Sequence, residues 1–207
     1  MIGVMSLLRD IVQGKPEFSF VDDKIRQQAA KAITKGLECI LKCQITVKGS
    51  KTAWCAQHDE KTLEPRKARS YELATLSGAE SVKIVRFLMA IEEPSPEMVE
   101  AIQAAVAWFD QVKIAGMRVK RVSDPSAPGG RDRVVVSDPS APTLWARFYE
   151  IETMRPIFCS RDGIPRYLLS EISHERRNGY SWLGGYARDL LAKDYPGWKQ
   201  RQGLTIQ

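Results

Sequence analysis

Arginines interleaved with aromatic residues mark the second half of the chain as a candidate ligand-binding region. They occur in three strings, LWARFYEIE (residues 144–152), RPIFCSRDG (155–163) and HERRNGY (174–180). A guanidinium binds a carboxylate through two parallel hydrogen bonds, so this composition favours a carboxylated polymer as the ligand. Ordinary surface ion pairs explain the arginines equally well when composition alone is considered. The acidic residues available for such pairs are Glu150, Glu152, Asp162 and Glu175.

An earlier polar segment has the residue types of a sugar-binding surface. It contains WCAQHDEKTLEP (residues 54–65), followed by ARSYE (68–72). Aromatic rings pack on the C–H faces of sugars, while amides and guanidiniums bond to hydroxyl groups. The alternative is that Trp54 belongs to the core and the rest is a solvated loop, and composition alone favours this alternative.

Other chemistries have weaker support in the sequence. Cys39 and Cys43 lie one helical turn apart, but on an apolar helix stripe we expect buried small residues rather than zinc ligands. The two histidines, His58 and His174, have no companion nucleophile, and no nucleophile elbow occurs. We therefore set aside serine and cysteine hydrolases.

The totals for the chain restrict its class and its partners. With 207 residues and 43% hydrophobic content it can bury a core, and we expect one globular unit over residues 1–207. The formal net charge of +6 favours polyanions such as nucleic acid, anionic lipid or acidic polysaccharide. Nucleic acid is disfavoured because the sequence has no reader motif and no basic helix run. We expect no membrane span, and residues 1–10 do not have the form of a secretion signal.

Helical periodicity dominates the first half of the chain. Residues 1–13 and 22–44 each carry an apolar stripe at helical spacing. A capping box begins the helix within residues 77–94, and a serine N-cap followed by proline begins the helix within 95–116. We expect these last two helices to form an antiparallel hairpin.

Two long stretches, residues 46–76 and 117–169, have no clear periodicity. Ordinary connections have about 4–6 residues, and loops of this greater length usually carry function. Within the second stretch, residues 133–137 and 144–151 have the composition of short strands. The heptapeptide VSDPSAP occurs twice there, at 122–128 and at 136–142. We interpret it as a chance or local duplication in proline-rich loops.

Five strings of the sequence resemble, in order, signature segments of the pectate lyases of polysaccharide lyase family ten. They are WCAQHDEKTLEPRKARSYE, LSGAESVKIVRFLM, LWARFYEIET, RPIFCSRDG and HERRNGY. The resemblance implies an all-α fold, an incomplete α/α barrel (toroid) with long irregular loops and a few short strands. It also implies that residues 1–207 are the C-terminal portion of a single catalytic domain.

The resemblance further implies an activity and the residues that perform it. Family members cleave α-1,4-linked polygalacturonate (pectate) by β-elimination, using calcium and an arginine that takes the C5 proton. By position, Arg161 in CSRDG resembles this base, and Arg147 and Arg176 resemble the arginines that bind the substrate carboxylate. Arg69 in ARSYE is expected to be a further substrate contact. Loss of the proton builds negative charge on the neighbouring carboxylate, so cations placed there stabilise the intermediate.

The calcium ligands are not identified by the resemblance. The string MIGVMSLLRDI resembles the family's helix that follows an Asn-Asp-Asp motif, and neither that motif nor the upstream aspartates occur in this sequence. Two hypotheses therefore stand, a calcium-dependent pectate lyase and a non-catalytic fragment that binds acidic polysaccharide. We expect polygalacturonate as partner, with self-association or a missing N-terminal half covering exposed apolar helix faces. An extracellular or periplasmic location is inferred from the family alone.

Overall fold

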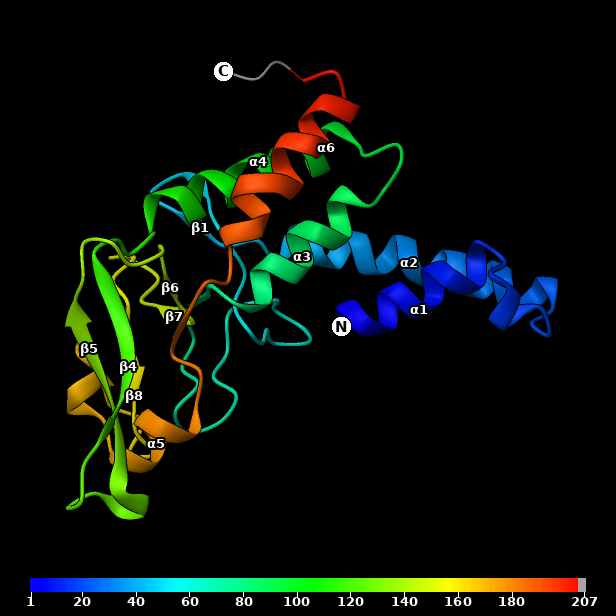
Figure 1. Ribbon diagram of the computed structural model, residues 1–207. Coiled ribbons are helices and arrows are strands. Elements are labelled where there is room, and N and C mark those ends of the chain that lie inside the picture. Colours follow the sequence, from blue (N-terminus) through cyan, green and yellow to red (C-terminus); the bar gives the residue numbers. More distant parts are fainter. Residues whose placement is uncertain (205–207) are drawn as a thin grey trace.

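The computed structural model describes residues 1–204, and its first two helices extend away from the rest of the chain (Figure 1). Helix α1 (Ile2–Val12) packs against helix α2 (Asp23–Lys42), with the 3₁₀ turn η1 (Pro16–Phe18) between them. Both helices were predicted from their apolar stripes. The side chain of Asp22 caps α2 by accepting a hydrogen bond of 2.8 Å from the backbone N–H of Ile25.

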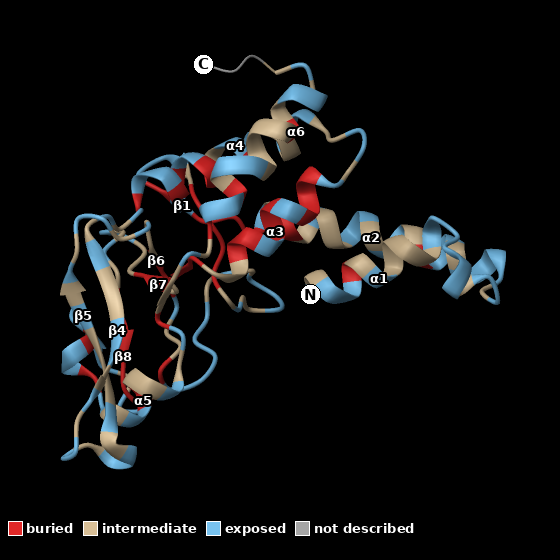
Figure 2. Cartoon of the chain, viewed as in Figure 1, coloured by how far each residue is buried: buried red, intermediate tan, exposed pale blue. Residues whose placement is uncertain are grey.

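The third and fourth helices were also predicted, and they contain much of the buried core (Figure 2). Helix α3 (Glu80–Met89) ends shortly before the expected proline, and helix α4 (Pro96–Gln111) begins with the predicted serine N-cap. The hydroxyl of Ser95 accepts a hydrogen bond of 3.3 Å from the backbone N–H of Met98. The two helices pack against each other, as the predicted hairpin requires.

Tryptophan side chains fill the centre of this core. Trp54 is buried, and its indole N–H donates a hydrogen bond of 2.7 Å to the carbonyl of Ile40 in α2. The interpretation of Trp54 as a core residue is thus confirmed. Trp198 comes from helix α6 (Tyr195–Arg201), which continues the π-helical turn η4 (Leu190–Asp194). The other fully buried tryptophans are Trp108, Trp145 and Trp182.

The remainder of the chain is built from strands, turns and one short helix. Its largest element is an antiparallel hairpin of β4 (Met117–Ser123) and β5 (Arg131–Ser137), closed by the turn η2 (Pro128–Gly130). The turn η3 (Leu169–Glu171) and helix α5 (His174–Gly179) follow. Four further strand pairs are two residues long: β1 (Thr46–Val47) with β2 (Ser50–Lys51), β3 (Leu76–Ser77) with β7 (Phe148–Tyr149), β6 (Trp145–Ala146) with β10 (Leu183–Gly184), and β8 (Phe158–Cys159) with β9 (Pro165–Arg166).

The prediction of an all-α fold with an incomplete α/α barrel is wrong, because the described chain is a mixed α/β structure without a closed barrel. Periodicity supports helices only over the first half of the sequence. In the hairpin, five valines lie on two strands that pair over seven residues each, and such β-branched side chains fit a pleated strand better than a helix. The strand expected at 133–137 lies within β5, whereas the one expected at 144–151 is divided into β6 and β7.

The duplicated heptapeptide has a structural role at the ends of the hairpin strands. In the first copy, the carboxylate of Asp124 accepts hydrogen bonds from the N–H and the hydroxyl of Ser126, at 3.0 and 2.6 Å. In the second copy, Asp138 accepts the same two bonds from Ser140, at 3.1 and 2.8 Å. Each copy therefore ends its strand with the same aspartate-initiated turn.

A close backbone contact joins the helices to the arginine-bearing loops. The N–H of Gly78, just before α3, donates a hydrogen bond of 2.8 Å to the carbonyl of Arg147. A Cβ atom on Gly78 would lie 2.1 Å from the carbonyl oxygen of Ala146, a separation that real atoms do not tolerate. Only glycine fits here, and the contact sets Arg147 beside the first turn of α3.

Among residues 1–204, no helix combines the length and the apolar character needed to cross a membrane.

Candidate functional site

The two long loops meet around a cavity of about 440 Å³. The first loop supplies Gln57, Arg69 and Glu72, and the start of α3 supplies Glu80. The second loop supplies Arg147 and Phe148, and Tyr180 comes from the end of α5. Both of the segments that composition marked as candidate binding regions therefore contribute to one concave site.

Arg147 lies in this cavity between a carboxylate and two aromatic rings. Its guanidinium forms an ion pair with Glu80 and lies 4.7 Å from the ring centre of Tyr180 and 5.8 Å from that of Phe148. Within residues 1–204, its buried Nε has no hydrogen-bond partner. These contacts fix the side chain and leave one donor unused.

The capping residue Glu80 has a role that the sequence did not indicate. In a capping box the glutamate reaches back to the backbone N–H of the cap residue. Here its carboxylate instead accepts a hydrogen bond from the hydroxyl of Ser77 and pairs with Arg147. The helix start thus orients an arginine of the cavity.

A second group of arginines surrounds Tyr71, which is buried. The guanidinium carbons of Arg176, Arg161 and Arg69 lie 4.5, 5.8 and 6.0 Å from the centre of its ring. Cations are attracted to the partial negative charge on the face of an aromatic ring, so the ring helps to hold these guanidiniums close together. The ring of Tyr71 also packs edge-on against Tyr180, at 5.2 Å between ring centres. The tyrosine pair therefore connects this group to Arg147.

One carboxylate, that of Glu175, is shared by two of these arginines. Arg161 donates two hydrogen bonds to it, of 3.2 and 2.9 Å, and Arg176 donates one of 2.6 Å and a second, shorter one. The guanidiniums of Arg176 and then of Arg161 lower the pKa of Glu175 to about 2. Arg176 is 9% exposed and Arg161 is 64% exposed, so only Arg161 is freely accessible to a ligand. Two cations against one anion leave excess positive charge at this point.

Polar contacts also hold Arg69 and Tyr180 in place. The guanidinium of Arg69 donates a bond of 3.0 Å to the hydroxyl of Tyr71, and its pKa is raised by this bond and by Glu72. The hydroxyl of Tyr180 donates a bond of 2.5 Å to Glu72. Burial and this bond raise the pKa of Tyr180, so the phenol stays protonated.

The structure thus brings together all four arginines predicted from the sequence, around two tyrosine rings. Arg69 and Arg147 line the cavity, while Arg161 and Arg176 lie on the adjoining face of Tyr71. No function was predicted for Tyr71 and Tyr180, which orient these arginines. The alternation of arginine with aromatic residues was the available signal, but spacing does not show which rings face which cations.

The described residues 1–204 contain no group of three His, Cys, Asp or Glu side chains close enough to hold a metal ion. Cys39 and Cys43 lie 4.0 Å apart through their sulfur atoms, and burial together with Cys39 raises the pKa of Cys43 to about 12. A protonated, buried thiol is a poor zinc ligand. His58 and His174 each bond to a backbone carbonyl, at 2.8 and 2.7 Å.

Comparisons with known proteins give one family and two close structural neighbours. A family model described as pectic acid lyase matches residues 1–191. A family 10 polysaccharide lyase from Cellvibrio cellulosa is 34% identical with a TM-score of 0.80, and the match covers 96% of this chain and 59% of that one. A point mutant of such an enzyme, in complex with trigalacturonic acid, is also 34% identical, with a TM-score of 0.82 over 98% and 61% of the two chains. This chain therefore spans about three fifths of the length of these lyases, and no curated protein matches it.

Proposed function

Because this chain belongs to the pectic acid lyase family, we propose that it is a pectate lyase that cleaves α-1,4-linked polygalacturonate by β-elimination. The observation that carries the proposal is the convergence of Arg69, Arg147, Arg161 and Arg176 around one cavity and one tyrosine pair. We retain the interpretation of residues 1–207 as the C-terminal portion of a single catalytic domain.

A polyuronate is the ligand that best matches the charges of the site. Each sugar unit carries one carboxylate, and a guanidinium fork binds a carboxylate through two parallel bonds. The two arginines at Glu175 are only half neutralised, and the exposed Arg161 is free to exchange this carboxylate for one of the substrate. The structural neighbour in complex with trigalacturonic acid supports this ligand class.

The arginines provide the electrostatic part of the elimination. Removal of the proton beside the sugar carboxylate moves negative charge onto that carboxylate, and fixed cations lower the free energy of this state. Arg147 is oriented for this role by Glu80 and Tyr180, and Arg176 by Glu175 and Tyr71. Because protein contacts hold them in place before the substrate arrives, little reorganisation accompanies the reaction.

Two arginines are candidates for the base that removes the proton. Arg161 is the candidate from the sequence resemblance, and it is paired with Glu175 through two hydrogen bonds. Arg69 is the second candidate, because it lines the same cavity as Arg147 whereas Arg161 does not, but Tyr71 and Glu72 raise the pKa of Arg69 and so oppose the loss of its proton. Comparison of Arg69→Lys with Arg161→Lys distinguishes them. Substitution of the arginine that acts as the base abolishes turnover and preserves ligand binding. Substitution of the other arginine reduces turnover and ligand binding together.

Calcium is implied by the family, but the residues described here do not fit a calcium site by themselves. The ion takes six to eight oxygen ligands, usually including several carboxylates, and residues 1–204 bring no three acidic side chains together. The acidic residues of the site, Glu72, Glu80 and Glu175, are already bonded to tyrosine or arginine. We therefore derive no step of the reaction through the metal.

The lack of an acidic cluster among residues 1–204 favours one alternative, that the chain binds acidic polysaccharide without cleaving it. The deciding experiment follows ultraviolet absorbance of the unsaturated uronide during incubation with polygalacturonate, in calcium and then in chelator. Calcium-dependent growth supports the lyase. Binding of oligogalacturonate without any growth in absorbance supports the alternative, and absence of binding contradicts both.

Exposed apolar side chains on the first two helices support the expected protein partner. The largest are Met1, Val4, Leu7, Val12, Phe20 and Ile25. An apolar surface of this kind marks an association site, and we propose self-association or a covering segment of the same protein. Sedimentation of the chain at several concentrations tests self-association, because a concentration-independent monomer contradicts it. An extracellular or periplasmic location is proposed from the substrate class.

A further inference from the structure

The hairpin of β4 and β5 concentrates three arginines on one face. Its register places Arg121 directly opposite Arg133, and Arg131 lies two residues before Arg133 on the same strand. Side chains alternate between the faces of a strand, so all three arginines belong to one face. Like charges placed directly opposite each other destabilise a strand pair. An anion bound at this face would reduce the repulsion between the three arginines.

No carboxylate within residues 1–204 forms an ion pair with any of these three arginines. The other face of the same hairpin differs, because Arg118 pairs with Asp138 at 2.5 Å. Arg133 donates a bond of 2.8 Å to the backbone carbonyl of Tyr180, which leaves its charge unneutralised. Arg121 and Arg131 are exposed to solvent. The uncompensated charge is thus confined to one face.

A small cavity lies where this face meets helix α5. Arg121, Pro128 and Arg131 of the hairpin and His174 and Asn178 of the helix line it. Its volume is about 190 Å³, roughly six times the ~30 Å³ that one water molecule occupies in the liquid. It has room for the carboxylate of a sugar together with part of the ring.

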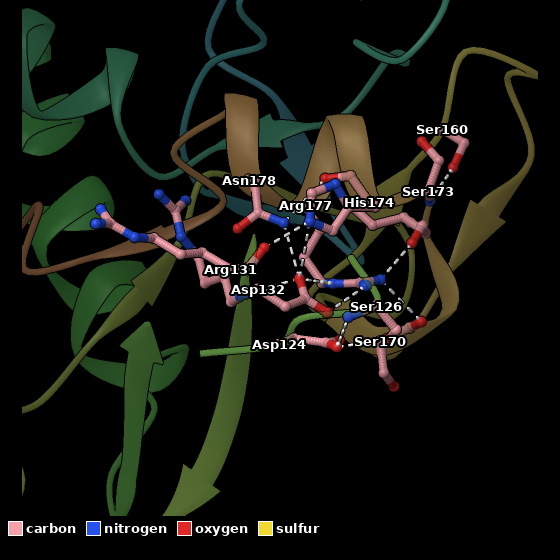
Figure 3. A network of polar contacts seen from close by, with 12 residues as sticks. Asp124, Ser126, Arg131, Asp132, Ser160, Ser170, Ser173, His174, Arg177 and Asn178 are labelled. Carbon is pink, nitrogen blue, oxygen red and sulfur yellow. Dashed lines mark hydrogen bonds and ion pairs between the residues drawn. The ribbon is translucent and has the colours of Figure 1, made fainter. Parts of the chain in front are cut away.

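Asp132, an acidic side chain beside this cavity, is already neutralised. Its carboxylate accepts hydrogen bonds of 2.8 and 2.6 Å from Arg177 and one of 2.8 Å from Asn178 (Figure 3). His174 lies 3.9 Å from it and bonds to the carbonyl of Arg131. This network anchors the hairpin to the helix and leaves the arginines of the cavity without a protein anion.

The same short helix also reaches the proposed reaction site. From α5, Arg176 contacts the ring of Tyr71, while His174 and Asn178 line the cavity at the hairpin. An α-helix with its side chains is about 10–12 Å in diameter, so the two places are separated by roughly one helix width. A polymer that occupies the first site is long enough to reach the second.

We propose that Arg121 and Arg131, with His174 and Asn178, form a remote subsite that binds a carboxylate of the galacturonate chain outside the units that react. The inference rests on the proposed function, because it takes the same acidic polymer as ligand. It assigns a role in binding and in preference for longer chains, and no role in the chemical step.

The test uses the double variant Arg121→Gln and Arg131→Gln, with Lys120→Gln as the control. Lys120 is an exposed cation of β4 whose side chain points to the opposite face, so its replacement removes a positive charge from the hairpin without touching the cavity. Binding of a series of oligogalacturonates, from the trimer upward, is measured at low and at high salt. A hydrogen-exchange map of each variant confirms that the hairpin remains docked.

The double variant is expected to bind long oligomers at least tenfold more weakly than the unchanged chain at low salt, with an effect that shrinks at high salt. Trimer binding is expected to weaken least, because a trimer held at Arg147 has the fewest further units that can reach the hairpin. An equal loss for the trimer and for long oligomers, or an equal loss in Lys120→Gln, overturns the subsite. If the unchanged chain binds no oligomer of any length, the proposed function and the subsite fail together; if it binds and the double variant binds equally well, only the subsite fails.

Discussion

The helices α1–α4, within residues 2–42 and 80–111, differ in character from the loops and strands of residues 46–76 and 117–184. In the first, buried apolar side chains such as Leu88 and Phe109 form the core, and most charged residues are exposed. In the second, arginines lie against aromatic rings and share carboxylates. The first region stabilises the fold, and the second positions the charged side chains of the site. Mutations in the first should therefore change stability, and mutations in the second should change activity.

The largest expected effect is the loss of activity in Arg147→Ala. Removal of one fixed cation from a site that stabilises developing negative charge lowers turnover by about 10²–10³-fold. The rate of unsaturated-uronide formation measures it. The control is Arg86→Ala, since Arg86 pairs with Asp194 on an exposed part of the helical region. Equal losses in both variants would remove the functional distinction between the two regions.

The next largest effect is a loss of stability from a substitution in the helical core, which should leave ligand binding unchanged. Leu88 is completely buried in α3, and Leu88→Ala is expected to lower the free energy of unfolding by about 2–5 kcal/mol. Denaturant titration gives this value, and calorimetry below the transition gives the affinity for trigalacturonate. A weaker affinity of the folded variant would mean that the helical core also shapes the site.

Asp132→Asn tests how the hairpin is attached to the rest of the loop region. Hydrogen bonds from Arg177 hold the pKa of Asp132 well below its usual range, aided by Asn178. A carboxyl whose pKa is lowered by folding stabilises the fold above its unfolded value near 4, and this contribution is lost as the pH falls below that value. We expect the variant to lose about 1–3 kcal/mol at neutral pH.

The pH dependence sharpens this prediction. Melting temperatures of the two proteins should differ at pH 7 and approach each other toward pH 2, because Asp132 is then protonated in the unfolded chain and its stabilising contribution decreases. A constant difference at all pH values would contradict the assignment of the stabilisation to this carboxylate. Glu175, whose pKa is lowered to about 2, also makes stability depend on pH, but it does so equally in both proteins.

The smallest expected effect is that of Ser95→Ala, which removes the N-cap of α4. Loss of the bond to the backbone N–H of Met98 should cost about 1 kcal/mol of stability. Thermal unfolding detects a change of this size, and Ser95→Asp is the matched variant that keeps a cap. Lyase activity is expected to stay constant in both, since α4 supplies no side chain to the cavity.

The sequence was informative where local chemistry determines structure. The stripes of α1 and α2, the Ser77–Glu80 pattern before α3 and the cap at Ser95 predicted four helices near their observed ends. Capping and amphipathicity act over a few residues, so a single sequence contains them. The shared location of the four arginines could also be anticipated, because the family resemblance orders the strings that contain them.

The sequence was uninformative where contacts between residues far apart in the chain determine the structure. The mixed α/β fold depends on pairings such as Leu76 with Tyr149, which lie far apart in the chain and leave no periodic pattern in two-residue strands. The pairing of Glu80 with Arg147 likewise depends on the contact at Gly78. Whether an arginine faces a tyrosine, a carboxylate or solvent is set by these long-range contacts.

The repeated heptapeptide ends both strands of the hairpin with the same local turn. Its two copies end two strands in the same way, using bonds that lie wholly within the repeated segment, from Asp124 to Ser126 and from Asp138 to Ser140. A strand terminator whose turn is closed by local bonds can be copied during evolution with little change to its neighbours, and the second copy adds an ion pair from Asp138 to Arg118. The arm that bears Arg121 and Arg131 could therefore change in length between related enzymes at little cost, and with it the reach toward a long polymer.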